Sequence, residues 1–205
     1  MVQTAEIVSE GQPAAAPVRT DTARKLRPEM VGPDTPEEPF PIYLSGKVAK
    51  GFGRGGKELG CPTANLEESS LVQIESKTRR TGVYYGYARV AQAAEGDNDV
   101  LPMVMSVGYN PYYKNEKLTA EIHVMHEFKS DFYGYEMRAV ILGYIRPEYD
   151  YVSRDALIED IDTDKQVALR SLSRSKYEEF KTDKHFFESD SEHPNGDGEV
   201  GGVRL

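Results

Sequence analysis

Short apolar runs that alternate with turn residues dominate the middle of this 205-residue chain. The runs are rich in Val, Ile, Tyr and Thr, and Gly, Pro, Asn and Asp separate them, which is typical of strands joined by turns. The pattern predicts strands at 41–48, 82–91, 103–107, 118–127 and 137–145. The short spacing between them favours antiparallel pairing.

A helical pattern follows the last strand. Ser153 is a suitable N-cap, Asp155 lies in the first turn, and Leu157, Ile158 and Ile161 supply an apolar face. Thr163 and Gln166 have the spacing of a capping box, so a second helix, or a continuation after a kink, would carry Val167, Ala168 and Leu172. Strands followed by a helix predict a mainly β fold, a small antiparallel barrel with the helix packed across it.

Both ends of the chain differ in composition from the middle. Residues 1–39 show no sustained period and are predicted to be a disordered tail, and residues 183–205 an acidic, largely disordered one, anchored at its start by Phe186 and Phe187. The predicted domain is 40–182. The net charge is −9, of which about −3 lies in residues 1–40 and −4 in 183–205. A core of about −2 argues against a nucleic-acid partner, which requires a basic surface.

The single cysteine, Cys61, excludes an intrachain disulfide and favours a reducing compartment. No apolar run reaches the roughly 18 residues of a membrane span, and the N-terminus lacks the apolar core of a signal peptide. We therefore expect a cytoplasmic monomer with no integral membrane segment.

A glycine-rich stretch, GKVAKGFGRGGKELGCPTANL, spans residues 46–66. Glycines at 51–60 allow backbone conformations in which successive N–H groups form an anion-binding concavity, and Arg54 and Lys57 add positive charge. The alternative is a flexible hairpin tip. Thr63 and Asn65 fall on one face if the segment is extended, and their oxygens suit Mg²⁺. Spacing alone favours the alternative, that they close a turn.

Glu121 stands in the apolar run LTAEIHVMHEF. A positioned carboxylate can accept a hydroxyl proton during phosphoryl transfer, although pattern alone favours a solvated outer face. On a strand, His123 and His126 lie on opposite faces, which disfavours a metal site; one is expected to pack and the other to meet a ligand or solvent.

Aromatic residues surround an arginine in SDFYGYE, 130–136, and YIRPEYDY, 144–151. Such a group can hold a flat heterocycle between rings while the arginine meets a polar edge. Ordinary packing at a barrel end explains the pattern equally well.

Taken together, these stretches resemble the riboflavin kinases of the single-domain eukaryotic type. The resemblance runs from about Tyr43 to Leu172, in family order and spacing. The stretches that show the resemblance are GKVAKGFGRGGKELGCPTANL, TGVYYGYARV, MVMSVGYNPYYKNEK, AEIHVMHEFKSDFYG and ILGYIRPE.

The resemblance implies a six-stranded antiparallel Greek-key barrel with a C-terminal helix. It also implies transfer of the ATP γ-phosphate to the 5′-hydroxyl of riboflavin, giving FMN and ADP, the first step of FMN and FAD synthesis. It assigns Thr63 and Asn65 to Mg²⁺, with Zn²⁺ or Mn²⁺ as substitutes, and Glu121 as the base. The nucleotide site matches Gly51, Lys57, Thr63, Val124, His126 and Tyr133, to which the glycine loop adds Gly53, Arg54 and Gly55. The flavin site matches Arg146, Tyr149 and Tyr151.

Two departures from the family pattern matter. Tyr149 and Tyr151 stand where some relatives carry a basic residue and a phenylalanine, so an individual flavin contact is expected to differ in kind. Only about 40 residues precede the predicted domain, too few for an adenylyltransferase domain, so no FAD synthesis is expected. The alternatives are a non-catalytic flavin-binding barrel and, less favoured, a barrel that binds nucleic acid.

Overall fold

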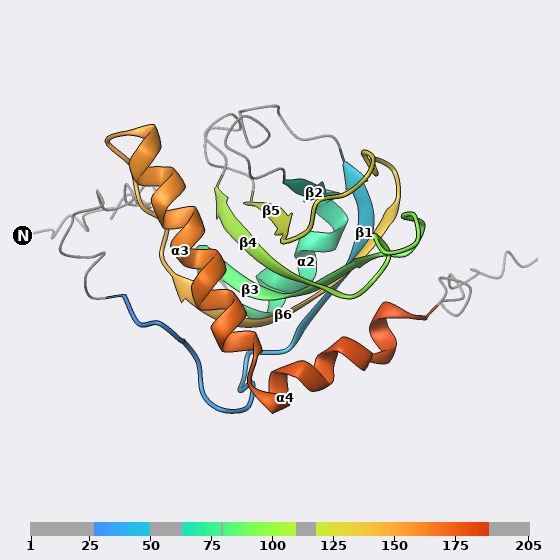
Figure 1. The fold of residues 1–205 in the computed structure, drawn as a ribbon, viewed down its shortest axis with the longest axis horizontal. Coiled ribbons are helices and arrows are strands. Elements are labelled where there is room, and N and C mark those ends of the chain that lie inside the picture. Colours follow the sequence, from blue (N-terminus) through green and yellow to red (C-terminus); the bar gives the residue numbers. More distant parts are fainter. Residues whose placement is uncertain (1–26, 50–62, 79, 110–117, 189–205) are drawn as a thin grey trace, which may run out of the picture.

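The computed structural model describes residues 27–49, 63–78, 80–109 and 118–188, and six strands in these ranges close into a barrel (Figure 1). They are β1 (Ile42–Ala49), β2 (Ala64–Leu66), β3 (Gly82–Val90), β4 (Leu101–Tyr109), β5 (Leu118–Val124) and β6 (Glu136–Arg146). The order around the barrel is β1-β2-β5-β4-β3-β6, and every neighbouring pair is antiparallel. The predicted fold class is confirmed.

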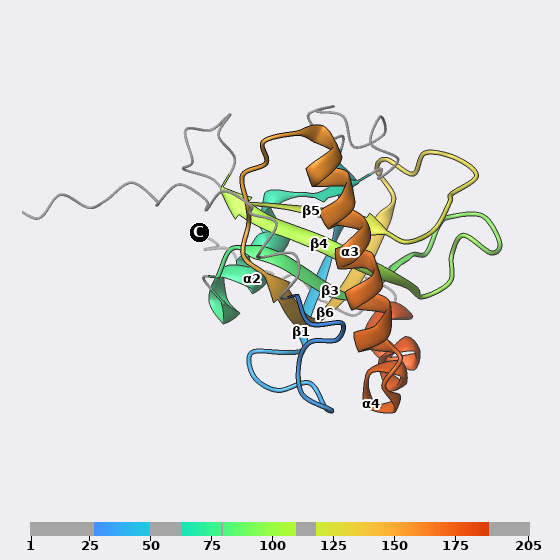
Figure 2. The same cartoon turned by 60° about the vertical axis from the view of Figure 1, so that its left-hand side comes forward.

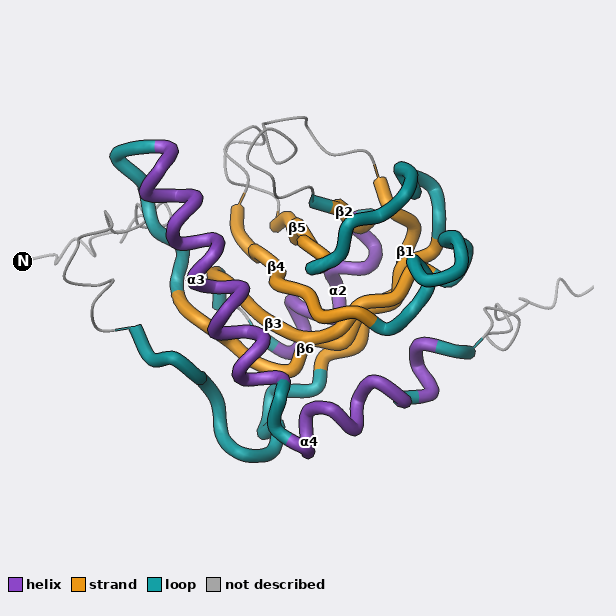
Figure 3. The backbone as a smooth tube through the Cα atoms, viewed as in Figure 1, coloured by secondary structure: helices purple, strands orange, loops and turns teal. Residues whose placement is uncertain are grey.

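A short helical segment after β2 was not predicted from the sequence. The 3-10 helix η1 (Glu68–Leu71) leads directly into α2 (Val72–Lys77), drawn in purple beside the strands in Figure 3. Leu71 and Ile74 are buried in the same apolar cluster as the barrel interior. A six-residue helix with one buried position is too short to show a 3.6-residue period.

The C-terminal helix α3 (Arg154–Leu172) crosses the outside of the barrel and contacts β3, β4 and β6 (Figures 1 and 2). Ser153 caps it as predicted, since its Oγ accepts from the Ala156 N–H at 3.2 Å. The predicted capping box at Thr163 is wrong. Thr163 Oγ1 instead donates to the Glu159 carbonyl at 2.7 Å within one uninterrupted helix.

The buried face of α3 also differs from the prediction. Leu157, Ile158 and Ile161 are only half-buried. The fully buried positions begin with Asp160 and Asp164 and end with Val167, Ala168, Ser171 and Leu172. The sequence favoured an apolar buried face because charged residues rarely occupy buried positions unless they have partners. The partners of these aspartates come from other segments of the chain, which the helix pattern does not show.

Two apolar clusters lie on either side of the barrel wall. The interior contains Leu44, Met105, Ile122 and Ile141. The outer cluster joins β3, β4 and β6 to α3 and to the turns that follow it: α4 (Ser175–Glu178), η3 (Glu179–Thr182) and η4 (Lys184–Phe186). Among its members are Tyr85, Val104, Tyr177 and Phe186. Phe186 therefore anchors this end of the domain, as expected, whereas Phe187 is exposed.

Residues 27–39, here called the N-terminal strap, run beside α3 before entering β1 (Figures 1 and 2). Val31 N donates to Ser171 Oγ at 3.0 Å, and Arg174 donates to the carbonyls of Val31 and Gly32 at 2.7 Å. The sequence predicted disorder for residues 1–39, whereas the strap has defined partners. Its low apolar content hid this order because polar contacts with α3 and with Arg174, just after α3, hold it.

Among the described residues, no helix is both long and apolar enough to cross a membrane.

Candidate active site

Asn65 and Glu121 lie side by side on the outer face of the barrel wall. Asn65 of β2 is the register partner of Glu121 of β5, and Glu121 is the partner of Ser106 of β4. Register partners point to the same face, and the neighbouring row, Ala64, Ile122 and Met105, is buried inside the barrel. The row of Asn65, Glu121 and Ser106 therefore faces outward, and paired Cα atoms in such a row are about 4.5–5.5 Å apart.

A pocket of about 360 Å³ opens where β2 and β5 meet the loop that leads to β6. Four residues predicted to bind the nucleotide line it: Thr63, Val124, His126 and Tyr133. Phe128 and Phe132 also line it, with ring centroids 4.4 Å apart. Phe132 belongs to the aromatic stretch SDFYGYE singled out in the sequence, whereas Phe128 was not predicted, although it stands in HEFKSDFYG, within a stretch that carried the resemblance.

Asp97, in the connection between β3 and β4, fixes the wall of this pocket. Its Oδ1 lies 2.9 Å from His126 Nε2, and its Oδ2 accepts from the Lys129 N–H at 3.0 Å. The hydrogen bonds with His126 and Lys129 hold the pKa of Asp97 below its ordinary value. As expected for the two histidines, one packs and one faces a site: His123 is buried, and His126 lines the pocket.

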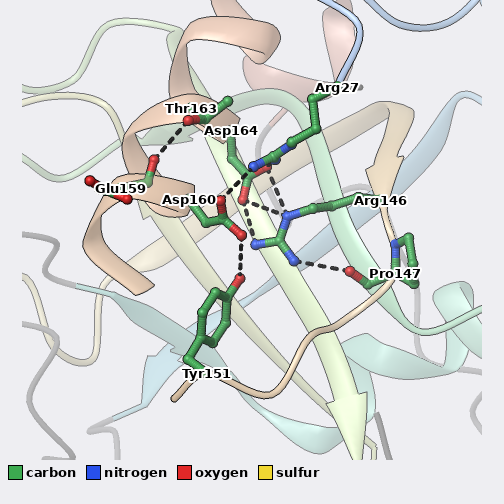
Figure 4. A network of polar contacts seen from close by, with 8 residues as sticks. All are labelled: Arg27, Arg146, Pro147, Tyr151, Glu159, Asp160, Thr163 and Asp164. Carbon is green, nitrogen blue, oxygen red and sulfur yellow. Dashed lines mark hydrogen bonds and ion pairs between the residues drawn. The ribbon is translucent and has the colours of Figure 1, made fainter. Parts of the chain in front are cut away.

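The three residues predicted to bind the flavin, Arg146, Tyr149 and Tyr151, lie at and just after the end of β6, and Figure 4 shows Arg146 and Tyr151 with their partners. Arg146 donates from Nε to both Asp164 carboxylate oxygens at 3.1 Å and from Nη2 to Oδ2 at 2.7 Å. Its guanidinium carbon lies 5.0 Å from the Tyr149 ring centroid. Tyr151 OH donates to Asp160 Oδ2 at 3.1 Å. Burial lowers the pKa of Arg146, but hydrogen bonds and charge from Asp164 outweigh it and raise the pKa overall.

Glu148 connects this cluster to the Glu121 row. Its carboxylate lies so close to Gly108 of β4 that a Cβ there would overlap it. Gly108 is two residues from Ser106, the partner of Glu121, and so on the same outer face, roughly 7 Å along the strand. Burial raises the pKa of Glu148. The flavin cluster and Glu121 thus occupy one surface, with Asn65 on the far side of Glu121.

Some predicted site residues lie outside the described residues: Gly51, Gly53, Arg54, Gly55 and Lys57. Within the described ranges, no group of three or more His, Cys, Asp or Glu side chains is arranged to hold a metal ion. The hydroxyl of Thr63, the amide of Asn65 and the carboxylate of Glu121 are nevertheless all oxygen donors. Such a set suits a hard cation whose remaining ligands are phosphate and water.

Comparisons with known proteins agree on one family. The family model described as "Flavokinase: Riboflavin kinase" matches residues 38–172. The riboflavin kinase of Pyricularia oryzae is 46% identical over 162 residues, covering 74% of this chain and 81% of the relative. That of Scheffersomyces stipitis is 42% identical, covering 76% and 98%. The crystal structure of riboflavin kinase from Trypanosoma brucei has a TM-score of 0.59 and 29% identity, covering 74% and 89%.

Proposed function

The chain belongs to the riboflavin kinase family, ATP-dependent enzymes that phosphorylate riboflavin, and we propose that it does so with Glu121, Asn65 and Thr63 at the reacting centre. The observation that supports this assignment is the register of β2, β5 and β4. It puts the carboxylate of Glu121 between Asn65 and the surface shared with Arg146 and Glu148. Transfer of a phosphoryl group from ATP to riboflavin requires a base between the groups that hold the metal and phosphates, here Thr63 and Asn65, and the residues that hold the flavin.

Glu121 orients the 5′-hydroxyl of the ribityl chain and accepts its proton. The hydroxyl oxygen forms a bond to the γ-phosphorus, the bond between that phosphorus and the β,γ-bridging oxygen breaks, and FMN and ADP result. Because phosphoryl transfer depends mainly on position and on stabilising charge, holding the hydroxyl in line contributes as much as removing its proton.

The nucleotide occupies the pocket lined by Val124, His126 and Tyr133, and the phosphates extend toward Thr63. Amides of the glycine loop, with Arg54 and Lys57, complete the phosphate site in this proposal. Arg146, Tyr149 and Tyr151 bind the flavin. An aromatic ring beside a guanidinium, as Tyr149 and Arg146 provide, fits the flat and polar surfaces of an isoalloxazine.

The family uses a divalent metal, and we propose Mg²⁺, with Zn²⁺ or Mn²⁺ as weaker substitutes. Thr63 and Asn65 would hold it, and it would neutralise the charge on the phosphates as the bond to the γ-phosphorus changes. We further propose that the chain acts as a cytoplasmic monomer.

The test is FMN formation from riboflavin, ATP and Mg²⁺ by the purified full chain, measured by chromatography. Replacing Glu121 with glutamine is expected to lower kcat at least about a hundredfold, as loss of a general base does. Glu75→Gln, at an exposed position of α2, is the control and should keep normal turnover. Full turnover in Glu121→Gln would remove Glu121 from the catalytic role. Flavin binding that is insensitive to ATP, with no FMN formed, would favour the non-catalytic flavin binder.

A further inference from the structure

The N-terminal strap places one arginine between the two buried aspartates of α3 (Figure 4). Arg27 Nη1 lies 3.1 Å from Asp160 Oδ1, and Arg27 Nη2 contacts Asp164 Oδ1. None of the three side chains is more than 9% exposed. The aspartates are four residues apart and so occupy one face of the helix, where a single guanidinium spans both.

Each aspartate also holds one residue assigned above to the flavin. Asp164 accepts three hydrogen bonds from Arg146, and Asp160 accepts one from the Tyr151 hydroxyl. Arg27 therefore lies behind both flavin residues and reaches them only through the carboxylates.

The charges in this cluster balance. Arg27 and Arg146 carry two positive charges, and Asp160 and Asp164 carry two negative charges. Burial raises the pKa of Asp164 overall, and the guanidiniums of Arg146 and Arg27 limit that rise. Without Arg27, the two buried carboxylates would lose the guanidinium that spans both, and like charges in a buried site cannot both ionise at low cost. One carboxylate would then take up a proton or turn away, and its flavin residue would lose a fixed partner.

We propose that Arg27 is a positioning residue for flavin recognition, holding Asp160 and Asp164 as ionised carboxylates that orient Tyr151 and Arg146 toward riboflavin. The proposal rests on the flavin roles assigned above. A segment before the barrel thereby takes part in recognising the acceptor substrate, at a separation of 137 residues from Asp164.

The strap has anchors that do not depend on Arg27. Val31, Gly32 and Pro33 are held by Ser171, Arg174 and Tyr177. An Arg27→Met variant should therefore keep the strap docked. The strap also offers a matched control, because Glu29 pairs with Arg170 at 3.2 Å in an exposed position.

The experiment compares Arg27→Met, Arg27→Met/Asp160→Asn, Glu29→Gln and Arg146→Lys in the full chain. KM for riboflavin and for ATP is measured in the FMN assay, and riboflavin affinity by quenching of flavin fluorescence. Arg27→Met should raise KM and Kd for riboflavin about tenfold or more, as misplaced substrate contacts do, with KM for ATP unchanged. The double variant restores charge balance and should return both riboflavin constants to within about threefold of wild type, about 0.7 kcal/mol at 25 °C. Glu29→Gln should match wild type.

Normal riboflavin constants in Arg27→Met would overturn the inference, as would equal rises in both KM values that Asp160→Asn does not rescue. If Arg27→Met does not fold, the test passes to Arg27→Met/Asp160→Asn. That variant should fold and bind riboflavin normally, and failure to do either would overturn the inference. Arg146→Lys separates the two proposals. If Arg146→Lys binds riboflavin with unchanged affinity, the flavin role of Arg146 itself is refuted. If Arg146→Lys raises the Kd for riboflavin while Arg27→Met leaves it normal, only the role of Arg27 is refuted.

Discussion

Replacing Asp164 with asparagine removes a charged partner of two buried arginines, Arg146 and Arg27, with little change in the size of the side chain. Arg146 is 8% exposed and makes three contacts of 2.7–3.1 Å with the Asp164 carboxylate. Removing one partner of a buried ion pair costs about 3–5 kcal/mol, because the remaining charge stays buried without compensation. Asp160 lies close enough to interact with Arg146, so the lower end, about 3 kcal/mol, is expected.

The assay is urea unfolding of the full chain at neutral pH, followed by circular dichroism. A loss of about 3 kcal/mol is a large share of the 5–15 kcal/mol typical of a domain and should shift the midpoint clearly at an unchanged slope. Glu29→Gln, which breaks the exposed pair with Arg170, should change the free energy of unfolding by no more than about 1 kcal/mol. A loss below about 1 kcal/mol in Asp164→Asn would show that burying Arg146 does not depend on this carboxylate, and the reasoning would fail.

Three further predictions concern the barrel and the two ends of the site. A Cβ at Gly86 would overlap the Val140 carbonyl oxygen on β6, so Gly86→Ala should lower the free energy of unfolding by about 1–3 kcal/mol; an unchanged thermal midpoint would contradict this. Asp97→Ala frees His126 and should raise KM for ATP but not for riboflavin, and equal effects on both would argue against a nucleotide role for the pocket. Burial raises the pKa of Glu148 in the folded chain, so ionising this carboxyl costs more in the folded than in the unfolded state. The free energy of unfolding of the wild type should therefore fall relative to that of Glu148→Gln as the pH rises above 4.5 toward 7. A difference between the two proteins that stays constant over this range would refute the shift.

Local pattern was sufficient for most of the fold. Apolar runs rich in Val, Ile, Tyr and Thr and bounded by turn residues located five of the six strands, because this composition marks a strand wherever it lies in the barrel. Ser153 was identifiable as a cap because capping involves only the next three residues. For PTANL, spacing alone favoured a turn over an extended segment, whereas three of its residues, Ala64–Leu66, form β2. The short α2 contained no comparable signal.

The structure brings several candidate residues together, but their roles stay predictions and their arrangement was not readable from the chain. Thr63, Val124, His126 and Tyr133 line one pocket. The neighbourhood of Asn65 and Glu121 depends on which strands pair and in which register, and barrel closure decides both.

The sequence by itself determined the class of fold and the family, because each depends on local composition or on motifs in order. Only the tertiary structure decided that two aspartates on a helix are buried, since a carboxylate is stable there only with a cation supplied from another segment. Arg27 and Arg146 are 119 residues apart by their numbers, and they meet on α3 because the barrel closes and the strap returns alongside the helix. The balance of charge among these buried side chains depends on contacts between distant segments, and no local sequence pattern contains that information.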